Sequence, residues 1–214
     1  MKISWPNSLI NDIARRRCVI FLGSGISRNS VNATGLHPKT WVEALESGMQ
    51  QLDKSIQRNI KRHILSKNFL MACELIRYTM GRDNFVGFLR NEFVTPRFAE
   101  ADIHKAIFEL DSRIVVTPNF DSIYDVYARH ETHGDIHVKH YYDEDVADAI
   151  RNDKRLILKI HGDIGTPDKL IFTKTDYAKA RSRHHNFYSI IEALLLTHTF
   201  IFLGAGLNDP DITL

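Results

Sequence analysis

The chain has 214 residues, of which 43% are hydrophobic and 25% charged, and this length and composition suit one globular domain, with or without a helical insertion. Its formal net charge of +2 gives no strong attraction to nucleic acid or to a membrane surface, so we predict no direct nucleic-acid binding by this domain. Two cysteines, Cys18 and Cys73, are too few for a disulfide framework or a four-cysteine zinc site, and we predict no bound metal.

The N-terminus does not have the features of a secretory signal, because Pro6 interrupts it before an apolar region develops. No apolar stretch approaches the roughly 18 residues that a membrane-spanning helix needs. We therefore expect a cytoplasmic protein that does not enter a membrane. The first predicted element is a short helix near residues 7–13, with Asn7 or Ser8 as its cap.

The first predicted strand is the apolar run CVIFL at residues 18–22, which is typical of a strand buried on both faces of a parallel sheet. Gly23, Ser24 and Gly25 follow it. A glycine-rich turn after a strand lets backbone N–H groups approach a diphosphate. The dinucleotide fingerprint G-x-G-x-x-G is incomplete, because Arg28 takes the third glycine position, so a tight turn without a ligand is the alternative interpretation.

Helical patterns dominate the next part of the chain. Thr40 and Glu43 form a T-x-x-E capping box, which predicts that a helix starts between them. Apolar residues then recur at helical spacing, with a break at Pro96. We predict a mainly helical module at about residues 45–110.

Further apolar runs of strand length follow, and helical patterns lie between most of them. They are residues 113–117, 155–160, 169–172 and 199–203. Strands that alternate with helices imply a parallel sheet with right-handed crossovers. The sequence therefore predicts an α/β fold.

Polar or glycine-rich residues follow four of the predicted strands. These clusters are Gly23-Ser24-Gly25, Asn119-Phe120-Asp121, His161-Gly162-Asp163 and Gly204-Ala205-Gly206. Because the carboxyl ends of parallel strands meet at one edge of a sheet, we expect the four clusters to converge on a ligand site.

Three of these residues carry side chains suited to catalysis. His161 ends a buried strand, which is a rigid mount for an imidazole that accepts a proton from a water or a sugar hydroxyl. Asn119 can orient such a hydroxyl, and Asp121 can hold a carboxamide or steady a positive charge. The alternatives are a packed histidine with backbone partners, and turn and helix-cap chemistry for the other two.

Four histidines crowd residues 130–140, at positions 130, 133, 137 and 140. The segment mixes them with glycine and charged residues and shows no clean periodicity. We therefore interpret it as a solvated loop rather than as a metal site.

Five short motifs, in this order along the chain, resemble the sirtuin-like family and in particular its compact bacterial branch of NAD-consuming defence domains. They are GSGIS at 23–27, GLHPKTW at 35–41, TPNFD at 117–121, KIHGD at 159–163 and FLGAGLNDPDI at 202–212. The resemblance implies a sirtuin-like NAD-binding domain over residues 1–214. It also implies a Rossmann-like parallel sheet with helices on both faces and a small helical insertion, and NAD as the substrate.

The resemblance also implies roles for individual residues. Asn119 would order the nicotinamide ribose and a water, Asp121 would face the carboxamide, and His161 would be the general base. The residues lining the diphosphate and ribose would be Gly23, Ser24, Gly25 and Ser27, and those flanking the adenosine half would be Gly204, Gly206 and Asn208.

Sirtuin deacylases carry a four-cysteine zinc module and a Phe-Arg pair after the glycine-rich loop, and this chain has neither. We therefore predict an NAD+ glycohydrolase (NADase) that yields nicotinamide and ADP-ribose, or a cyclic form of it, as the effector of a bacterial antiviral defence system. The alternatives are an NAD-dependent deacylase or ADP-ribosyltransferase, and a non-catalytic nucleotide-sensing assembly module. We also expect a homo-oligomer or a partner sensor that controls activity, and a further region after Leu214.

Overall fold

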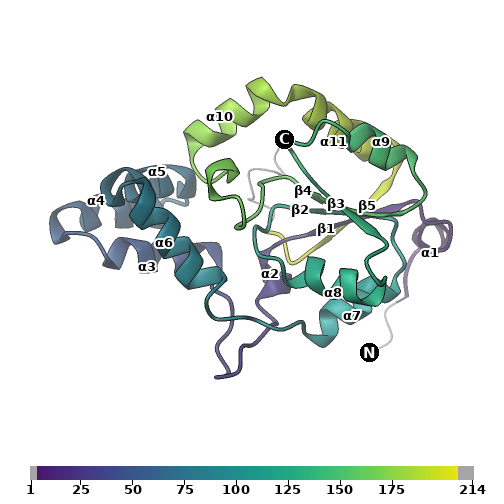
Figure 1. Ribbon diagram of the computed structural model, residues 1–214, viewed down its shortest axis with the longest axis horizontal. Coiled ribbons are helices and arrows are strands. Elements are labelled where there is room, and N and C mark those ends of the chain that lie inside the picture. Colours follow the sequence, from purple (N-terminus) through teal and green to yellow (C-terminus); the bar gives the residue numbers. More distant parts are fainter. Residues whose placement is uncertain (1–3, 207–214) are drawn as a thin grey trace.

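The structure, a computed structural model, describes residues 4–206 and contains a five-stranded sheet that is parallel throughout (Figure 1). The strands are β1 (Cys18–Leu22), β2 (Ile114–Thr117), β3 (Ile136–His140), β4 (Arg155–Lys159) and β5 (Thr199–Leu203), in the order β3-β4-β2-β1-β5. This confirms the predicted α/β fold with a Rossmann-like parallel sheet.

Helices cover both faces of the sheet (Figure 1). Their bounds are α1 Asn7–Ala14, α2 Ser24–Ser27, α3 Trp41–Gln50, α4 Lys54–Leu65, α5 Phe69–Met80, α6 Arg82–Phe93, α7 Asp102–Glu109, α8 Ile123–Glu131, α9 Val146–Arg151, α10 Lys174–Arg183 and α11 His185–Thr197, with a short 3-10 helix at Pro167–Lys169. Helices α9, α10 and α11 cover one face, and α2, α7 and α8 cover the other. Within residues 4–206, no helix is long and apolar enough to cross a membrane.

The packing of β1 on both faces of the sheet explains why its sequence is apolar throughout. Successive side chains of a strand point to opposite faces of the sheet. Val19 and Phe21 pack in the core beneath α9–α11, whereas Ile20 and Leu22 pack in the core beneath α2, α7 and α8. Burying one such side chain contributes about 1.5–3 kcal/mol. A polar residue at any of these positions would therefore be costly, which explains the continuous apolar run.

The course of the chain places a crevice beside β1. After β1 the chain builds β2, β3 and β4 on one side of that strand, and then returns to place β5 on its other side. In open α/β sheets, ligands bind beyond the carboxyl ends of the strands at such a reversal. The turn that follows β1 lies at this point.

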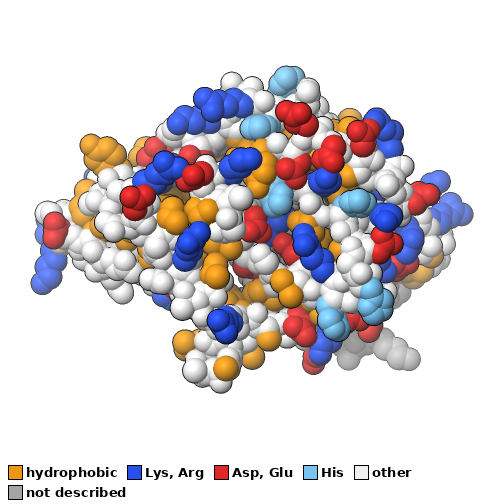
Figure 2. Space-filling model, in the orientation of Figure 1, with side chains coloured by type: hydrophobic (Ala, Val, Ile, Leu, Met, Phe, Trp, Pro, Cys, Tyr) orange, Lys and Arg blue, Asp and Glu red, His pale blue; other side chains and the backbone are white. Residues whose placement is uncertain are grey.

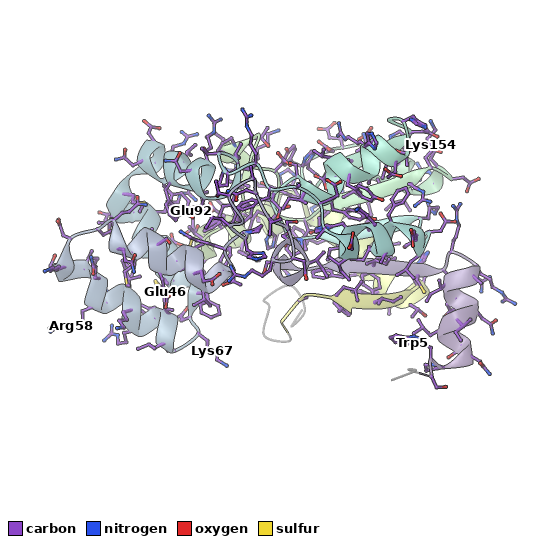
Figure 3. All side chains as sticks on the ribbon, turned by 90° about the horizontal axis from the view of Figure 1, so that it is seen from below. Trp5, Glu46, Arg58, Lys67, Glu92 and Lys154 are labelled. Atoms are coloured by element: carbon purple, nitrogen blue, oxygen red, sulfur yellow. The ribbon has the colours of Figure 1, made fainter. Side chains whose placement is uncertain are left out.

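Helices α3 to α6, which we call the helical module, form a group of their own beside the sheet (Figure 1). They enclose an apolar core that includes Leu45 and Ile60. Figure 3 shows Lys154, just before β4, at the end of the molecule opposite Glu46 and Lys67 of this group. The helical module therefore lies next to the carboxyl ends of the strands, whereas α7 packs against a face of the sheet.

The structure corrects two predictions about strands, and it places Pro6, not Asn7 or Ser8, at the N-cap of α1. Residues 136–140 form the edge strand β3, which pairs with β4, where we expected a solvated loop. Residues 169–172, predicted as a strand, begin at the end of the 3-10 helix and take no part in the described sheet. This segment is apolar because Ile171 packs in the core beneath α9–α11, while Leu170 and Phe172 pack in the core of the helical module.

Candidate functional site

The carboxyl ends of β1, β2 and β4 meet at a cavity of about 360 Å³. A cavity of this size suits a small ligand or part of a larger one. Six of the residues predicted from the sequence line it: Ser24, Ser27, Asn119, Asp121, His161 and Gly206. The expected convergence of strand ends is therefore present in the structure. Asn208, also predicted for the site, lies outside the described residues.

The opposite wall of the cavity is mainly apolar, with Lys39 and Lys67 at it, and comes largely from the helical module. Trp41 of α3, Phe69 of α5 and Phe93 of α6 line it. In Figure 2, hydrophobic side chains border a hollow between the helical module and the sheet. An apolar wall of this kind excludes water and strengthens the electrostatic interactions made by the polar wall.

The glycine-rich turn after β1 is packed against the end of β5. The N–H groups of Gly23 and Gly25 donate to the carbonyls of Leu203 and Gly204, both at 2.9 Å. A Cβ atom on Gly23 would lie 2.5 Å from the Gly204 carbonyl oxygen, closer than atoms can approach. These two glycines therefore allow two turns to touch, and Ser24 is the residue of the turn that reaches the cavity.

Gly204 completes the same contact from the other side. Its φ is +64°, a left-handed conformation that favours glycine, and an added Cβ would lie 2.5 Å from the backbone nitrogen of Ile26. Gly206 lies further along, and a Cβ there would meet nothing within 4 Å. The predicted site glycines at 23, 25 and 204 thus hold the two turns together and do not line the cavity, whereas Gly206 does.

Ser27, Asn119 and Asp121 form a chain of hydrogen bonds across the polar wall. The Asn119 side-chain amide donates to Ser27 Oγ (3.2 Å), and Ser27 Oγ donates to Asp121 Oδ2 (2.8 Å). The other carboxylate oxygen, Oδ1, accepts from the N–H of Ile123 at the start of α8 (3.1 Å). Asp121 therefore performs the expected turn chemistry and also lines the cavity.

His161 stands at the end of β4 and is almost fully buried, with 6% of its surface exposed. Gly162, which follows it, has a φ of +82°, and a Cβ there would lie 2.6 Å from the Lys169 carbonyl oxygen. The chain can turn sharply after His161 only because the next residue is glycine. The imidazole Nε2 lies 2.9 Å from the hydroxyl of Tyr177 on α10, and the direction of this hydrogen bond follows the ring tautomer.

Lys159 was not marked by the sequence reasoning, although it belongs to the KIHGD motif. Its side chain is fully buried beneath the site. The ammonium donates to the carbonyl of Asp121 (2.6 Å), to Asp125 Oδ2 (2.8 Å) and to Asp163 Oδ2 (2.7 Å). Lys159 therefore ties the turn after β2 to the turn after β4. A lysine at the end of an apolar strand, with an aspartate four residues later, was the available signal.

The charged groups of this cluster shift one another's pKa values. Burial raises the pKa of Asp125 despite the nearby Lys159 ammonium. Burial alone would lower the pKa of Lys159, but the attraction of Asp125 and Asp163 raises it overall. Burial would likewise raise the pKa of Asp163, but the Lys159 ammonium and the N–H of Gly165 lower it overall. The ion pair between Lys159 and Asp163 is therefore present at neutral pH.

Residues 113–214 match the family model of the SIR2-like domain. The second half of the chain is therefore similar to a SIR2-like domain. The match spans β2 to β5 and includes Asn119, Asp121 and His161 of the polar wall. The resemblance drawn from the five sequence motifs is thereby confirmed.

Curated relatives are distant in sequence, but the similarity to them spans nearly all of this chain. The defense-associated sirtuin 2 of Bacillus subtilis is 25% identical over 203 residues, which is 92% of this chain and 19% of that protein. The NAD(+) hydrolase ThsA of Acinetobacter baumannii is 22% identical over 204 residues, covering 95% and 39% of the two chains. ThsA of Bacillus cereus is 22% identical over 201 residues, covering 94% and 39%. The chain thus spans less than half the length of these relatives.

A second cavity, of about 460 Å³, lies between the loop after α2 and helix α3. Its cations already have carboxylate partners. Arg28 pairs with Glu43 at 2.8 Å, and Lys39 pairs with Glu92 at 2.7 Å. These pairs fasten the loop to the helical module.

Proposed function

We propose that the cavity at the strand ends binds NAD+ and that the chain hydrolyses the bond between nicotinamide and ribose. The observation that carries the proposal is the convergence of Ser27, Asn119, Asp121 and His161 from three strand ends on one cavity of about 360 Å³. The names of two relatives, which describe NAD(+) hydrolases, support it. NAD+ is a substrate in this proposal rather than a resident cofactor.

The reaction needs little covalent chemistry from the protein. The C1′–N bond of NAD+ breaks, its electron pair goes to nicotinamide, and positive charge develops on the ribose, as in other glycosyl transfers. A water then forms the new C1′–O bond and releases one proton. The protein holds the ribose and the water in position, which is the main source of acceleration when the leaving group is already cationic.

Each polar group has a place in this scheme. Asn119 orients the water or a ribose hydroxyl, since its amide can both donate and accept. Asp121, with Ser27 hydrogen-bonded to it, faces the carboxamide and favours positive charge in the cavity. His161 accepts the proton that the reaction releases, and such a general base contributes about 10²- to 10⁴-fold to the rate.

We further propose that NAD+ depletion by this chain serves antiviral defence, and that a partner protein or self-assembly controls it, because uncontrolled hydrolysis would harm the cell. The name of the Bacillus subtilis relative, a defense-associated sirtuin, supports the first point. Whether the product is linear or cyclic ADP-ribose is read directly from a chromatogram of the reaction.

The test is NAD+ consumption by the wild type and by Asn119→Ala and His161→Ala, with folding checked by circular dichroism. A matched control is His130→Ala, because the His130 side chain is 83% exposed on α8 and does not line the cavity. We expect each site variant to lose about 10²- to 10⁴-fold in rate and the control to retain activity. Wild-type hydrolysis that survives both site changes contradicts the proposal.

The same assay separates the alternatives. Nicotinamide release that requires an acyl-lysine peptide would indicate a deacylase, and transfer of label to protein would indicate an ADP-ribosyltransferase. Calorimetric binding of NAD+ without turnover, unchanged in His161→Ala, would indicate a sensing module.

A further inference from the structure

Tyr177 lines the same cavity as His161, although no sequence motif marks it. It lies in the second turn of α10, and its hydroxyl is 2.9 Å from His161 Nε2. The two rings also meet edge to face, with centroids 5.0 Å apart and planes at 77°. Together, a hydrogen bond and a ring contact restrict the rotation of the imidazole about its Cβ–Cγ bond.

The residue just before Tyr177 is held by the helical module. Asp176 Oδ2 accepts from the guanidinium of Arg77 on α5 (2.5 Å). The same oxygen accepts from the backbone N–H of Thr173 (3.0 Å), which starts α10 with a capping box. The Asp176 side chain is 14% exposed and that of Arg77 is 39% exposed, so the carboxylate side of this ion pair is shielded from solvent.

Thr175, the residue before Asp176, is also held by helix α5. Thr175 donates from its hydroxyl to Glu74 Oε1 (2.7 Å) and from its backbone N–H to Glu74 Oε2 (3.2 Å). Three consecutive residues of α10 therefore have linked contacts. The first two bind α5, and the third, Tyr177, binds the imidazole at the end of β4.

We propose that Tyr177 is a positioning residue for His161 and that Glu74 and Arg77 of the helical module hold Tyr177 in place. The catalytic consequence rests on the function proposed above. A displacement of α5 would move the start of α10 and so release the imidazole from its orientation. The helical module thereby forms one wall of the cavity and also controls the general base.

The physical reason is geometric. A general base must lie within hydrogen-bond reach of the proton that it accepts, and an error of about 1 Å in position costs on the order of 10²-fold in rate. The backbone of His161 is fixed, because its carbonyl accepts from the N–H of Ile171 at 3.0 Å. The contact with Tyr177 restricts the rotation of the ring about the Cβ–Cγ bond.

The first experiment measures kcat and KM for NAD+ in Tyr177→Phe, which keeps the ring and removes the hydroxyl. The matched control is Tyr142→Phe, which removes a hydroxyl that bonds to Thr166 at 2.9 Å outside the cavity. We expect kcat to fall about tenfold in Tyr177→Phe with KM within about twofold of the wild type, and the control to match the wild type.

The same change is then made in the His161→Ala background. If Tyr177 acts through His161, Tyr177→Phe has no further effect there, because residues that act as a unit are not additive. An equal fold-loss in both backgrounds, or no loss in the wild-type background, overturns the inference.

The second experiment does not depend on activity. The ¹⁵N resonances of the His161 ring report the hydrogen bond at Nε2, and we expect them to shift in Tyr177→Phe and to stay unchanged in Tyr142→Phe. Arg77→Met should shift them in the same direction. Its control is Arg58→Met on the outer side of α4 (Figure 3), which should leave them unchanged.

The outcomes separate this inference from the proposed function. Wild-type hydrolysis with unchanged His161 resonances in Tyr177→Phe overturns the inference and leaves the function standing. Shifted resonances in Tyr177→Phe but not in Arg77→Met overturn the role of the helical module. No hydrolysis by the wild type overturns the function, and this inference with it.

Discussion

Replacing Lys159 with methionine tests whether the buried ion cluster holds two turns of the site together. Methionine fills nearly the same space but removes the charge and all three donors. The Asp125 and Asp163 carboxylates, which accept from the ammonium at 2.8 and 2.7 Å, then lose their shared cation. The carbonyl of Asp121 loses its donor at the same time.

The size of the loss follows from the burial. Lys159 is fully buried and Asp125 is 9% exposed, so water does not replace the broken contacts. Removing one partner of a buried ion pair costs about 3–5 kcal/mol. We expect the free energy of unfolding of Lys159→Met to fall by this amount at pH 7, which is a large part of the stability of a domain of this size.

The pH dependence of the loss has a definite sign. Burial already raises the pKa of Asp125, and removal of the cation raises it further. A carboxyl whose pKa is higher in the folded than in the unfolded state stabilises the protein at low pH and loses that contribution as the pH rises. The difference between Lys159→Met and the wild type should therefore be smaller at pH 5 than at pH 7.

The assay is urea denaturation followed by far-ultraviolet circular dichroism. The matched control is Lys154→Met, which removes an ion pair with Asp135 at the surface, where the side chains are 48% and 66% exposed. Exposed pairs contribute at most about 1 kcal/mol. A loss in Lys159→Met no larger than that of Lys154→Met would refute the role given to the cluster.

Three further predictions concern other parts of the molecule. Gly204→Ala should lower the free energy of unfolding by about 1–3 kcal/mol, because its φ is +64° and its Cβ would strike a backbone nitrogen, whereas Gly206→Ala should leave the melting temperature unchanged. Burial raises the pKa of the Cys73 thiol well above its usual range, so it should not react with a thiol reagent at pH 8 until urea unfolds the chain; fast reaction of the folded protein would contradict this. The hydrogen bond from Arg16 holds the pKa of Asp111 below its usual 3.8, so this pair stabilises the fold above that pH and stops doing so as the pH falls through the lowered pKa. Below pH 3.8, the free energy of unfolding should therefore fall less steeply with decreasing pH in Asp111→Asn than in the wild type. Equal slopes in the two proteins would contradict the assignment.

Three of the predicted strands were recognisable because both faces of the sheet are covered around them, whereas the edge strand β5 was recognisable from its apolar run although its residues are only partly buried. Burial on both faces forces a continuous apolar run, as in β1, β2 and β4. Strand β3 lies at the edge and is half buried throughout, so its sequence IHVKH carries histidine and lysine, and its pattern resembles a loop. Residues 170–172 show the converse error, because an irregular segment between two cores is as apolar as a strand.

The candidate site likewise contains residues that could be predicted from the sequence and residues that could not. Asn119, Asp121 and His161 could be singled out because each directly follows a strand, so local sequence fixes its place at the sheet edge. Tyr177 could not, because its contact with His161 depends on how α10 packs beside β4 and on the bonds that α10 makes to α5. The hydrogen-bond partners of the N–H groups in the glycine-rich turn could not be predicted either, because they lie at the end of β5, nearly 180 residues away in the chain.

The central claim is that one cavity at the strand ends holds NAD+. Hydrogen–deuterium exchange of the His161→Ala protein, with and without NAD+, tests it most directly. We predict slower exchange with NAD+ in peptides that cover residues 23–27, 117–121 and 159–163, and no change in peptides from β3 and α11. Protection confined to other segments, or no protection at a NAD+ concentration that the wild type consumes, would contradict the account.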